Sequence, residues 1–187
     1  KEAWGIAHIV KYSHERMTEL PEGSDFGANT ILQIETLGGD GLRYRARFGR
    51  KVTSPWKKVH AFKAQTVRDT AGAGDWCTAG ILHHLARDGA KGLKAIKPTE
   101  LEAGLKFGQA LAAWNCGYLG ARGGMEVSSL DNCLDQVNRM IGGETPSGTS
   151  FNARISEVAA NTWCPTCGDT RSPGEEGSAS SRKRTIA

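Results

Sequence analysis

The sequence contains no apolar run long enough to cross a bilayer, and its start, KEAWGIAHIV, lacks the basic, apolar and cleavage regions of a secretory signal. These absences predict a cytoplasmic protein with no membrane partner. Only the terminal SRKR gathers basic residues, and the formal net charge is +4. The sequence shows no basic face that would indicate nucleic-acid binding.

The cysteines are too few to form a disulfide framework, because there are five of them, an odd number, without dense spacing. Cys164 and Cys167 form one C-x₂-C knuckle in WCPTCG, but no second pair follows. A tetrahedral zinc site needs four ligands. Two interpretations stay open: a zinc site completed by His83, His84, another cysteine or a second chain, or two reduced thiols. Three cysteines lie in helical patterns and are expected in the core: Cys77, Cys116 and Cys133.

The chain has no internal repeat and no initiator methionine. Its 187 residues, 39% hydrophobic, are enough for one domain with a substantial core. We expect a main domain at 1–143, an extension with the CxxC knuckle at 144–167, and a disordered polar tail at 168–187. A first residue other than methionine leads us to expect a piece of a longer protein.

Short apolar runs predict strands in the first half and helices in the second. Strands are expected at 7–11, 31–37, 42–48 and 59–67, with a tight turn at GGDG, 38–41. Amphipathic helices are expected at 75–86, from 99 onward, and at 130–141. The first should bury Trp76, Ala79, Leu82 and Leu85; the second Leu101, Leu105, Gly108 and Ala112; the third Leu130, Leu134, Val137 and Ile141. Strands followed by helices predict an α/β fold.

The segment VRDTAGAGDW, 67–76, combines a run of small residues with an aspartate at the start of a predicted helix. Gly72, Ala73 and Gly74 allow a sharp turn and a close approach of the backbone to a ligand, and the first N–H groups of a helix have no partner within it. These features predict an anion site. Asp75 would repel a bound phosphate, so it is either an ordinary helix cap or a base held beside a phosphoryl group.

Three segments, taken in order, resemble the ribokinase-like, or pfkB, family of carbohydrate kinases. DTAGAGD at 69–75 matches every fixed position of the family's D-T-x-G-A-G-D signature, and TLGGDG at 36–41 is similar to its T-x-G-x-x-G loop. GQALAAWNCGYLGA at 108–121 resembles the Ala-rich helix and G-A turn beside the adenine pocket. The resemblance covers residues 3 to 141 and implies a ribokinase-like three-layer α/β sandwich, here a truncated sheet flanked by helices.

The resemblance implies a role for each matching residue. Asp75 would be the catalytic base that takes the proton from a sugar hydroxyl, and the amides of Gly72, Ala73 and Gly74 would receive the charge that develops on the transferred group. The nucleotide phosphates or ribose would lie against Thr36, Gly38 and Gly41, for which a simple hairpin turn is the alternative. Gln109 would lie near the adenine, unless it is a surface glutamine.

The implied cofactors are ATP and Mg²⁺, with a monovalent cation such as K⁺ held largely by carbonyl oxygens near Asp69 and the turn at Ala121. The alternative for those two segments is a helix-start turn and a loop. The family's N-x-x-E motif, which organises Mg²⁺ and phosphate, is changed here: in KYSHERM, Ser13 replaces the asparagine and Arg16 the glutamate, while Glu15 offers a displaced carboxylate.

Nothing in the chain corresponds to the sugar-contacting half of the family. We therefore expect the first strand to lie at a sheet edge that a missing N-terminal segment or another copy covers. The function expected of the whole protein is ATP-dependent phosphotransfer to a hydroxyl of a sugar or sugar-like compound. The alternative is a non-catalytic nucleotide-binding or regulatory module of the same fold.

Overall fold

The computed structural model describes residues 6–17, 27, 29–48, 52–64 and 66–144, all within the first compact unit of the chain, Lys1–Pro146. The expected extension and tail, with Cys164 and Cys167, lie outside the described residues. Within the described part, no helix is both long and apolar enough to cross a membrane.

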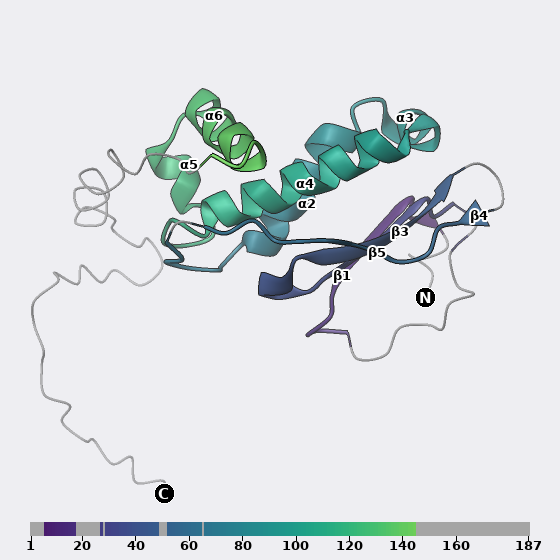
Figure 1. Cartoon of the computed structure of the whole chain (residues 1–187), viewed down its shortest axis with the longest axis horizontal. Coiled ribbons are helices and arrows are strands. Elements are labelled where there is room, and N and C mark those ends of the chain that lie inside the picture. The colour runs from purple at the N-terminus through teal and green to yellow at the C-terminus, as the bar shows by residue number, and fades with distance from the viewer. Residues whose placement is uncertain (1–5, 18–26, 28, 49–51, 65, 145–187) are drawn as a thin grey trace, which may run out of the picture. The chain divides into compact units, whose positions relative to one another are not determined.

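The described strands form one mixed sheet (Figure 1). The first two are parallel neighbours, the second pairs antiparallel with the third, and the last two both pair antiparallel with the third. They are β1 (Ile9–Ser13), β2 (Leu32–Thr36), β3 (Leu42–Phe48), β4 (Val52–Thr53) and β5 (Lys57–Val59). Among the described residues β1 pairs only with β2, as expected for an edge strand.

Alternation along β2 and β3 gives the sheet one apolar and one polar face. Leu32, Ile34, Leu42, Tyr44 and Ala46 belong to the hydrophobic core. The alternating residues lie on the opposite face, where Glu35 is buried and bonded to His14 and Arg43. Burial alone would raise the pKa of Glu35, but the hydrogen bonds from Arg43 and His14 outweigh it and hold the pKa below its usual value.

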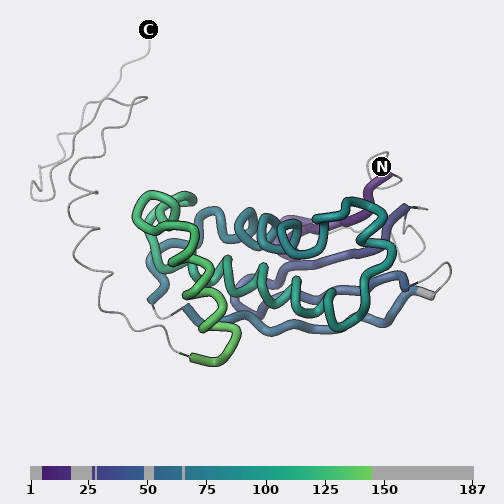
Figure 2. The backbone as a smooth tube through the Cα atoms, turned by 90° about the horizontal axis from the view of Figure 1, so that it is seen from above, coloured from purple at the N-terminus to yellow at the C-terminus, as the bar shows by residue number. Residues whose placement is uncertain are grey.

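Two helices cover the apolar face, α2 (Ala73–Leu85) and α4 (Pro98–Asn115), which run side by side in Figure 2. Glycines allow them to approach closely, because a Cβ added to Gly80 would lie 2.8 Å from the Cα of Gly108. The helix α4 begins with Pro98, and the Glu100 side chain accepts the backbone N–H of Lys97 at 3.1 Å. All four residues predicted to be buried on α4 are buried.

The buried side predicted for α2 is wrong in part. Leu85 is buried as expected, but Ala79 is exposed and Leu82 is 45% exposed, while Cys77, Gly80 and Ile81 are buried. The reason is the contact through Gly80, which turns the glycine side of the helix toward α4.

The buried residues predicted for α6 (Leu130–Ile141) are also wrong in part. Val137 is buried as predicted, but Leu130 is 72% exposed and Ile141 is 37% exposed, because this helix packs on α4 near its middle, through Cys133 and Val137. Periodicity alone does not show that a helix is covered for only part of its length.

The strand predicted at 59–67 is also wrong, because β5 ends at Val59 and residues 60–64 continue without strand pairing. Val59 pairs with Leu42, the first residue of β3, so the partner strand offers nothing further to pair with. Hydrophobic periodicity did not predict three short elements of the described part: β4, α3 (Gly89–Ala95) and α5 (Gly123–Val127). A 3-10 turn, η1 (Gly38–Asp40), stands where the tight turn was predicted.

Candidate active site

Three of the predicted motifs meet at one edge of the sheet. The strands β1 and β2 are parallel and their last residues, Ser13 and Thr36, are register partners, so both carboxyl ends lie together and η1 follows directly. The start of α2 reaches the same place, because Lys11 Nζ in β1 donates to the Gly74 carbonyl at 3.0 Å. Crevices outside the carboxyl ends of strands are the usual ligand sites of α/β sheets.

Gly72 adopts a backbone conformation that only glycine tolerates at this place. Its φ is 73°, in the left-handed region, and a Cβ on it would lie 2.8 Å from the Cβ of Ala121. Of the three amides predicted to face an anion, that of Ala73 donates to the Thr70 carbonyl at 3.2 Å, while those of Gly72 and Gly74 have no hydrogen bond to the described residues. The open amides at this helix start are therefore those of Gly72 and Gly74.

Asp75 is exposed in the first turn of α2, and its carboxylate has no hydrogen-bond or ion-pair partner among the described residues. The acid is not buried against the described protein. Its backbone N–H donates to the Gly72 carbonyl at 2.9 Å, which fixes the start of its side chain beside the open amides. Asp75 can therefore approach a hydroxyl group presented at the same helix start.

Asp69 bridges two loops through both carboxylate oxygens. Oδ1 accepts the Ala71 N–H at 2.9 Å, and Oδ2 accepts the Gly120 N–H at 2.8 Å. These backbone hydrogen bonds, the one from Ala71 first, lower the pKa of Asp69. The N–H groups of Arg68 and Asp69 donate to the Cys116 carbonyl at 2.8 and 3.3 Å. We call residues 68–76 and 115–121 together the two-loop clamp.

The TLGGDG loop is shaped by two glycines with positive φ, Gly38 at 58° and Gly41 at 98°. A Cβ on Gly41 would lie 2.2 Å from the Val59 carbonyl oxygen, so this glycine is required by packing alone. Thr36 Oγ1 donates to the Tyr12 carbonyl at 3.3 Å, and it faces β1 in the structure. The loop is a hairpin turn between β2 and β3, placed beside the start of α2.

Gln109 is not a surface residue, because it lies in α4 and is only 8% exposed. Its Nε2 is buried and has no hydrogen-bond partner within the described part. Buried amide groups normally have partners. The unsatisfied donor is unusual for a buried amide, and the place of Gln109 near a base stays a prediction.

The changed N-x-x-E segment lies next to the TLGGDG loop. Ser13 ends β1, and Glu15 Oε1 would be 3.7 Å from a Cβ on Gly38, so Glu15 presents a carboxylate to η1. Arg16 is exposed, and His14 is directed to Glu35.

Sequence reasoning missed two residues at this site. Lys11 places an ammonium group at the positive end of the α2 dipole, where a cation without a bound anion is unfavourable. Trp76 Nε1 donates to the Ala121 carbonyl at 2.7 Å, and its ring packs edge-on against Trp114. For Lys11 the signal was a lysine at the end of the predicted strand AHIVK, and for Trp76 the sequence contains no signal.

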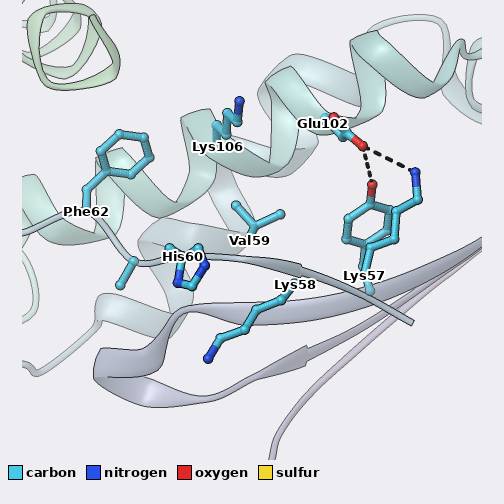
Figure 3. A pocket seen from close by; sticks show the side chains of 9 residues that line it. Lys57, Lys58, Val59, His60, Phe62, Glu102 and Lys106 are labelled. Atoms are coloured by element: carbon cyan, nitrogen blue, oxygen red, sulfur yellow. Dashed lines mark hydrogen bonds and ion pairs between the residues drawn. The ribbon is translucent and has the colours of Figure 1, made fainter. Parts of the chain in front are cut away.

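A cavity of about 430 Å³ lies elsewhere, between α4 and the chain that follows β5 (Figure 3). Glu102 accepts a hydrogen bond from the Tyr44 hydroxyl at 2.9 Å and one from Lys57 at 3.4 Å. Lys58 and Lys106 point in different directions, so their charges do not converge. None of the predicted site residues lines this cavity.

The class of protein follows from this geometry: an α/β protein with a glycine-rich helix start, an exposed acid and a cation at the carboxyl edge of its sheet, which together suit a phosphoryl group. The sequence profile of the pfkB family of carbohydrate kinases matches residues 27–127. The chain belongs to this family.

Individual proteins similar to this chain are also carbohydrate or nucleoside kinases by name. The chain is 34% identical over 131 residues to the "Probable fructokinase-6, chloroplastic" of Arabidopsis thaliana, covering 63% of this chain and 31% of the relative. The fold resembles that of ribokinase from Giardia lamblia, with a TM-score of 0.54, 14% identity, and coverage of 73% of this chain and 45% of the other. It also resembles aminoimidazole riboside kinase from Salmonella enterica, with a TM-score of 0.52, 20% identity, and coverage of 74% and 43%. These likenesses confirm the ribokinase fold, and the chain spans less than half the length of each of these relatives.

Proposed function

We propose that the whole protein of which this chain is part uses ATP to phosphorylate a hydroxyl of a sugar or sugar-like compound. The observation that carries the proposal is the exposed Asp75 beside the open amides of Gly72 and Gly74. The names of the relatives support it, since one is a probable fructokinase and another is a riboside kinase complexed with aminoimidazole riboside and an ATP analogue.

In this reaction Asp75 takes the proton from the acceptor hydroxyl as its oxygen attacks the γ-phosphorus. The new O–P bond forms while the bond from the γ-phosphorus to the β,γ-bridging oxygen breaks, and that oxygen leaves on ADP. Charge builds on the transferred oxygens, where the amides of Gly72 and Gly74 are already oriented to receive it. Lys11 adds positive charge at the same helix start and holds the Gly74 carbonyl.

The nucleotide would extend from this helix start toward α4. The TLGGDG loop, with Thr36, Gly38 and Gly41, borders the same strand ends, and the unsatisfied Gln109 amide offers hydrogen bonds to the base or ribose. No group of three or more His, Cys, Asp or Glu side chains forms a metal site within the described residues. Magnesium carried mainly by phosphates fits that finding. Glu15 and Ser13 would contact it, and it would offset phosphate charge.

A missing N-terminal half is part of this proposal. The matched region covers 31% of the fructokinase relative and 45% of the ribokinase, and β1 has an open edge among the described residues. An upstream segment or a second copy would pair with β1 and supply the contacts to the sugar. We place this activity in the cytoplasm.

A non-catalytic nucleotide-binding module is the second candidate. Ser13 and Arg16 favour it, because an arginine cannot recruit a cation as the usual glutamate does. Nucleotide binding is common to both candidates, so binding alone does not separate them.

Phosphate transfer by the full-length protein separates the two functions. ATP turnover is measured against a panel of sugars and nucleosides, with Asp75→Asn as the test. We expect turnover to fall by about 10²–10⁴-fold while nucleotide affinity changes little, because a general base contributes about that much.

Asp131→Asn is the matched control, because Asp131 is also an exposed acid in the first turn of a helix, α6. It should leave turnover unchanged. Full turnover in Asp75→Asn would contradict the proposed role. Nucleotide binding without transfer to any acceptor would favour the non-catalytic module.

A further inference from the structure

The two-loop clamp occupies the segments in which the family resemblance places a monovalent cation. Such a cation is held by several oxygen atoms, mostly carbonyls, that point at a shared centre. The donor set in this chain does not fit that requirement, because N–H groups already bond the carbonyls of Ala71 and Ala121, one in each segment of the clamp. This inference rests on the proposed function only for the clamp's place beside the phosphoryl site.

We infer that the side-chain N–H groups of Asn115 and Trp76 do in this protein what a monovalent cation does in the family, so that the two-loop clamp holds its shape without K⁺. Asn115 Nδ2 donates to the Ala71 carbonyl at 3.4 Å, and Trp76 Nε1 donates to the Ala121 carbonyl at 2.7 Å. Each of the two segments of the clamp therefore donates one side-chain N–H to a carbonyl of the other, Asn115 from the end of α4 and Trp76 from the start of α2.

Several other oxygens of the clamp also accept hydrogen bonds. Both carboxylate oxygens of Asp69 accept backbone N–H groups. The carbonyls of Thr70, Cys116 and Gly120 accept the N–H groups of Ala73, Arg68 and Gly123 at 3.2, 2.8 and 3.3 Å. A cation at this place would have to displace or share these bonds.

The orientation of the Asn115 side-chain amide distinguishes a clamp held by hydrogen bonds from a clamp held by a cation. Asn115 is 0% exposed, and with Nδ2 on Ala71 its Oδ1 has no partner within the described part. The opposite orientation would set Oδ1 against the Ala71 carbonyl oxygen, and two acceptors face each other stably only with a cation or a donor between them. The arrangement with Nδ2 on Ala71 needs no ion.

Trp76 and Trp114 offer a matched pair for testing this. Each ring donates one indole hydrogen bond, Trp76 to Ala121 and Trp114 to Gln136 Oε1 at 2.9 Å, and the rings pack against each other. Replacement by phenylalanine removes the donor and keeps an aromatic ring. Only the Trp76 bond belongs to the clamp.

The test is thermal unfolding of the full-length protein, without nucleotide or sugar, in KCl and in choline chloride at equal ionic strength. We expect the same Tm in both salts for the wild type. Asn115→Ala and Trp76→Phe should unfold about 2–4 °C lower in choline chloride, and KCl should restore part of that loss by satisfying the freed carbonyls. Trp114→Phe should lose stability equally in both salts.

Each other outcome overturns the inference. A saturable rise in wild-type Tm with K⁺ would show that the ion binds the native clamp. Clamp variants that respond to K⁺ no more than Trp114→Phe would show that the two donors do not stand in for an ion. Because melting needs no catalysis, these results decide the inference even if the proposed phosphate transfer fails.

Discussion

The two-loop clamp and the cavity beside α4 differ in the chemical groups that form them. The first uses backbone N–H and carbonyl groups, positive-φ glycines and one exposed acid, and lies at the rim of the sheet. The second is a space of about 430 Å³ walled by long side chains, with its one carboxylate already bonded to Tyr44 and Lys57. A phosphoryl group needs fixed main-chain dipoles more than volume, so the larger hollow is not the better candidate site.

The comparison predicts the largest effect at Gly72. Gly72→Ala forces an alanine into φ 73° and against Ala121 at 2.8 Å, and we expect about 1–3 kcal/mol lower stability together with loss of phosphate transfer. Gly89→Ala is the control, because Gly89 has φ 58° but nothing within 4 Å of an added Cβ. Denaturant unfolding and turnover measure both. Equal losses in the two variants would show that the contact with Ala121 is unimportant.

A smaller effect is expected at Lys11. Lys11→Met keeps the aliphatic stem and removes the ammonium that bonds Gly74. Loss of a positive charge beside the proposed phosphate site should lower nucleotide affinity, measured by calorimetry, about tenfold, which corresponds to about 1.4 kcal/mol. Lys58→Met changes a lysine at the cavity and should leave affinity unchanged. A larger loss of affinity in Lys58→Met than in Lys11→Met would indicate that the nucleotide binds at the cavity.

The smallest effect is expected at Glu102. The hydrogen bond from Tyr44 lowers the pKa of this carboxyl, with burial acting in the opposite direction and Lys57 assisting. A lowered pKa stabilises the fold above the unfolded pKa, and the gain is lost as pH falls through the folded pKa. Because the side chain is 42% exposed, Glu102→Gln should cost only about 0.2–1 kcal/mol at pH 7.

Urea unfolding at several pH values checks this prediction. The difference between wild type and Glu102→Gln should shrink as pH falls below about 4.3, the ordinary value for glutamate. A difference that persists in full at pH 3 would mean that Glu102 acts through packing and not through its charge.

The sequence alone marked several of the residues that meet at the candidate site, because glycine runs mark the turns that bring them together. Gly72 and Gly41 have positive φ and lie where a side chain would collide with the backbone or with Ala121. Positions of this kind require glycine and can therefore be recognised in the sequence. Lys11 and Trp76 were missed because their partners, Gly74 and Ala121, are distant in sequence and bond through carbonyls that every residue has.

The fold was predictable to a similar extent and for a similar reason. Alternation located β2 and β3 because each has one face in the core. It misplaced the buried side of α2, since the missing side chain of Gly80 lets that side of α2 approach α4 closely, while Leu82 is left exposed. Where a strand ends depends on its partner, as Val59 and Leu42 show, and no local pattern contains that information.

The close meeting of Gly80 and Gly108 sets a gauge for the proposed ligand. Gly80 lies about two turns along α2 from the amides that would receive phosphate, and Gly108 directly precedes Gln109 on α4. If ATP binds as proposed, the distance between the amides that receive phosphate and Gln109 depends on how closely the two helix backbones approach. A methyl group at either glycine would push α2 and α4 apart, so that the proposed nucleotide could no longer contact both the α2 amides and Gln109.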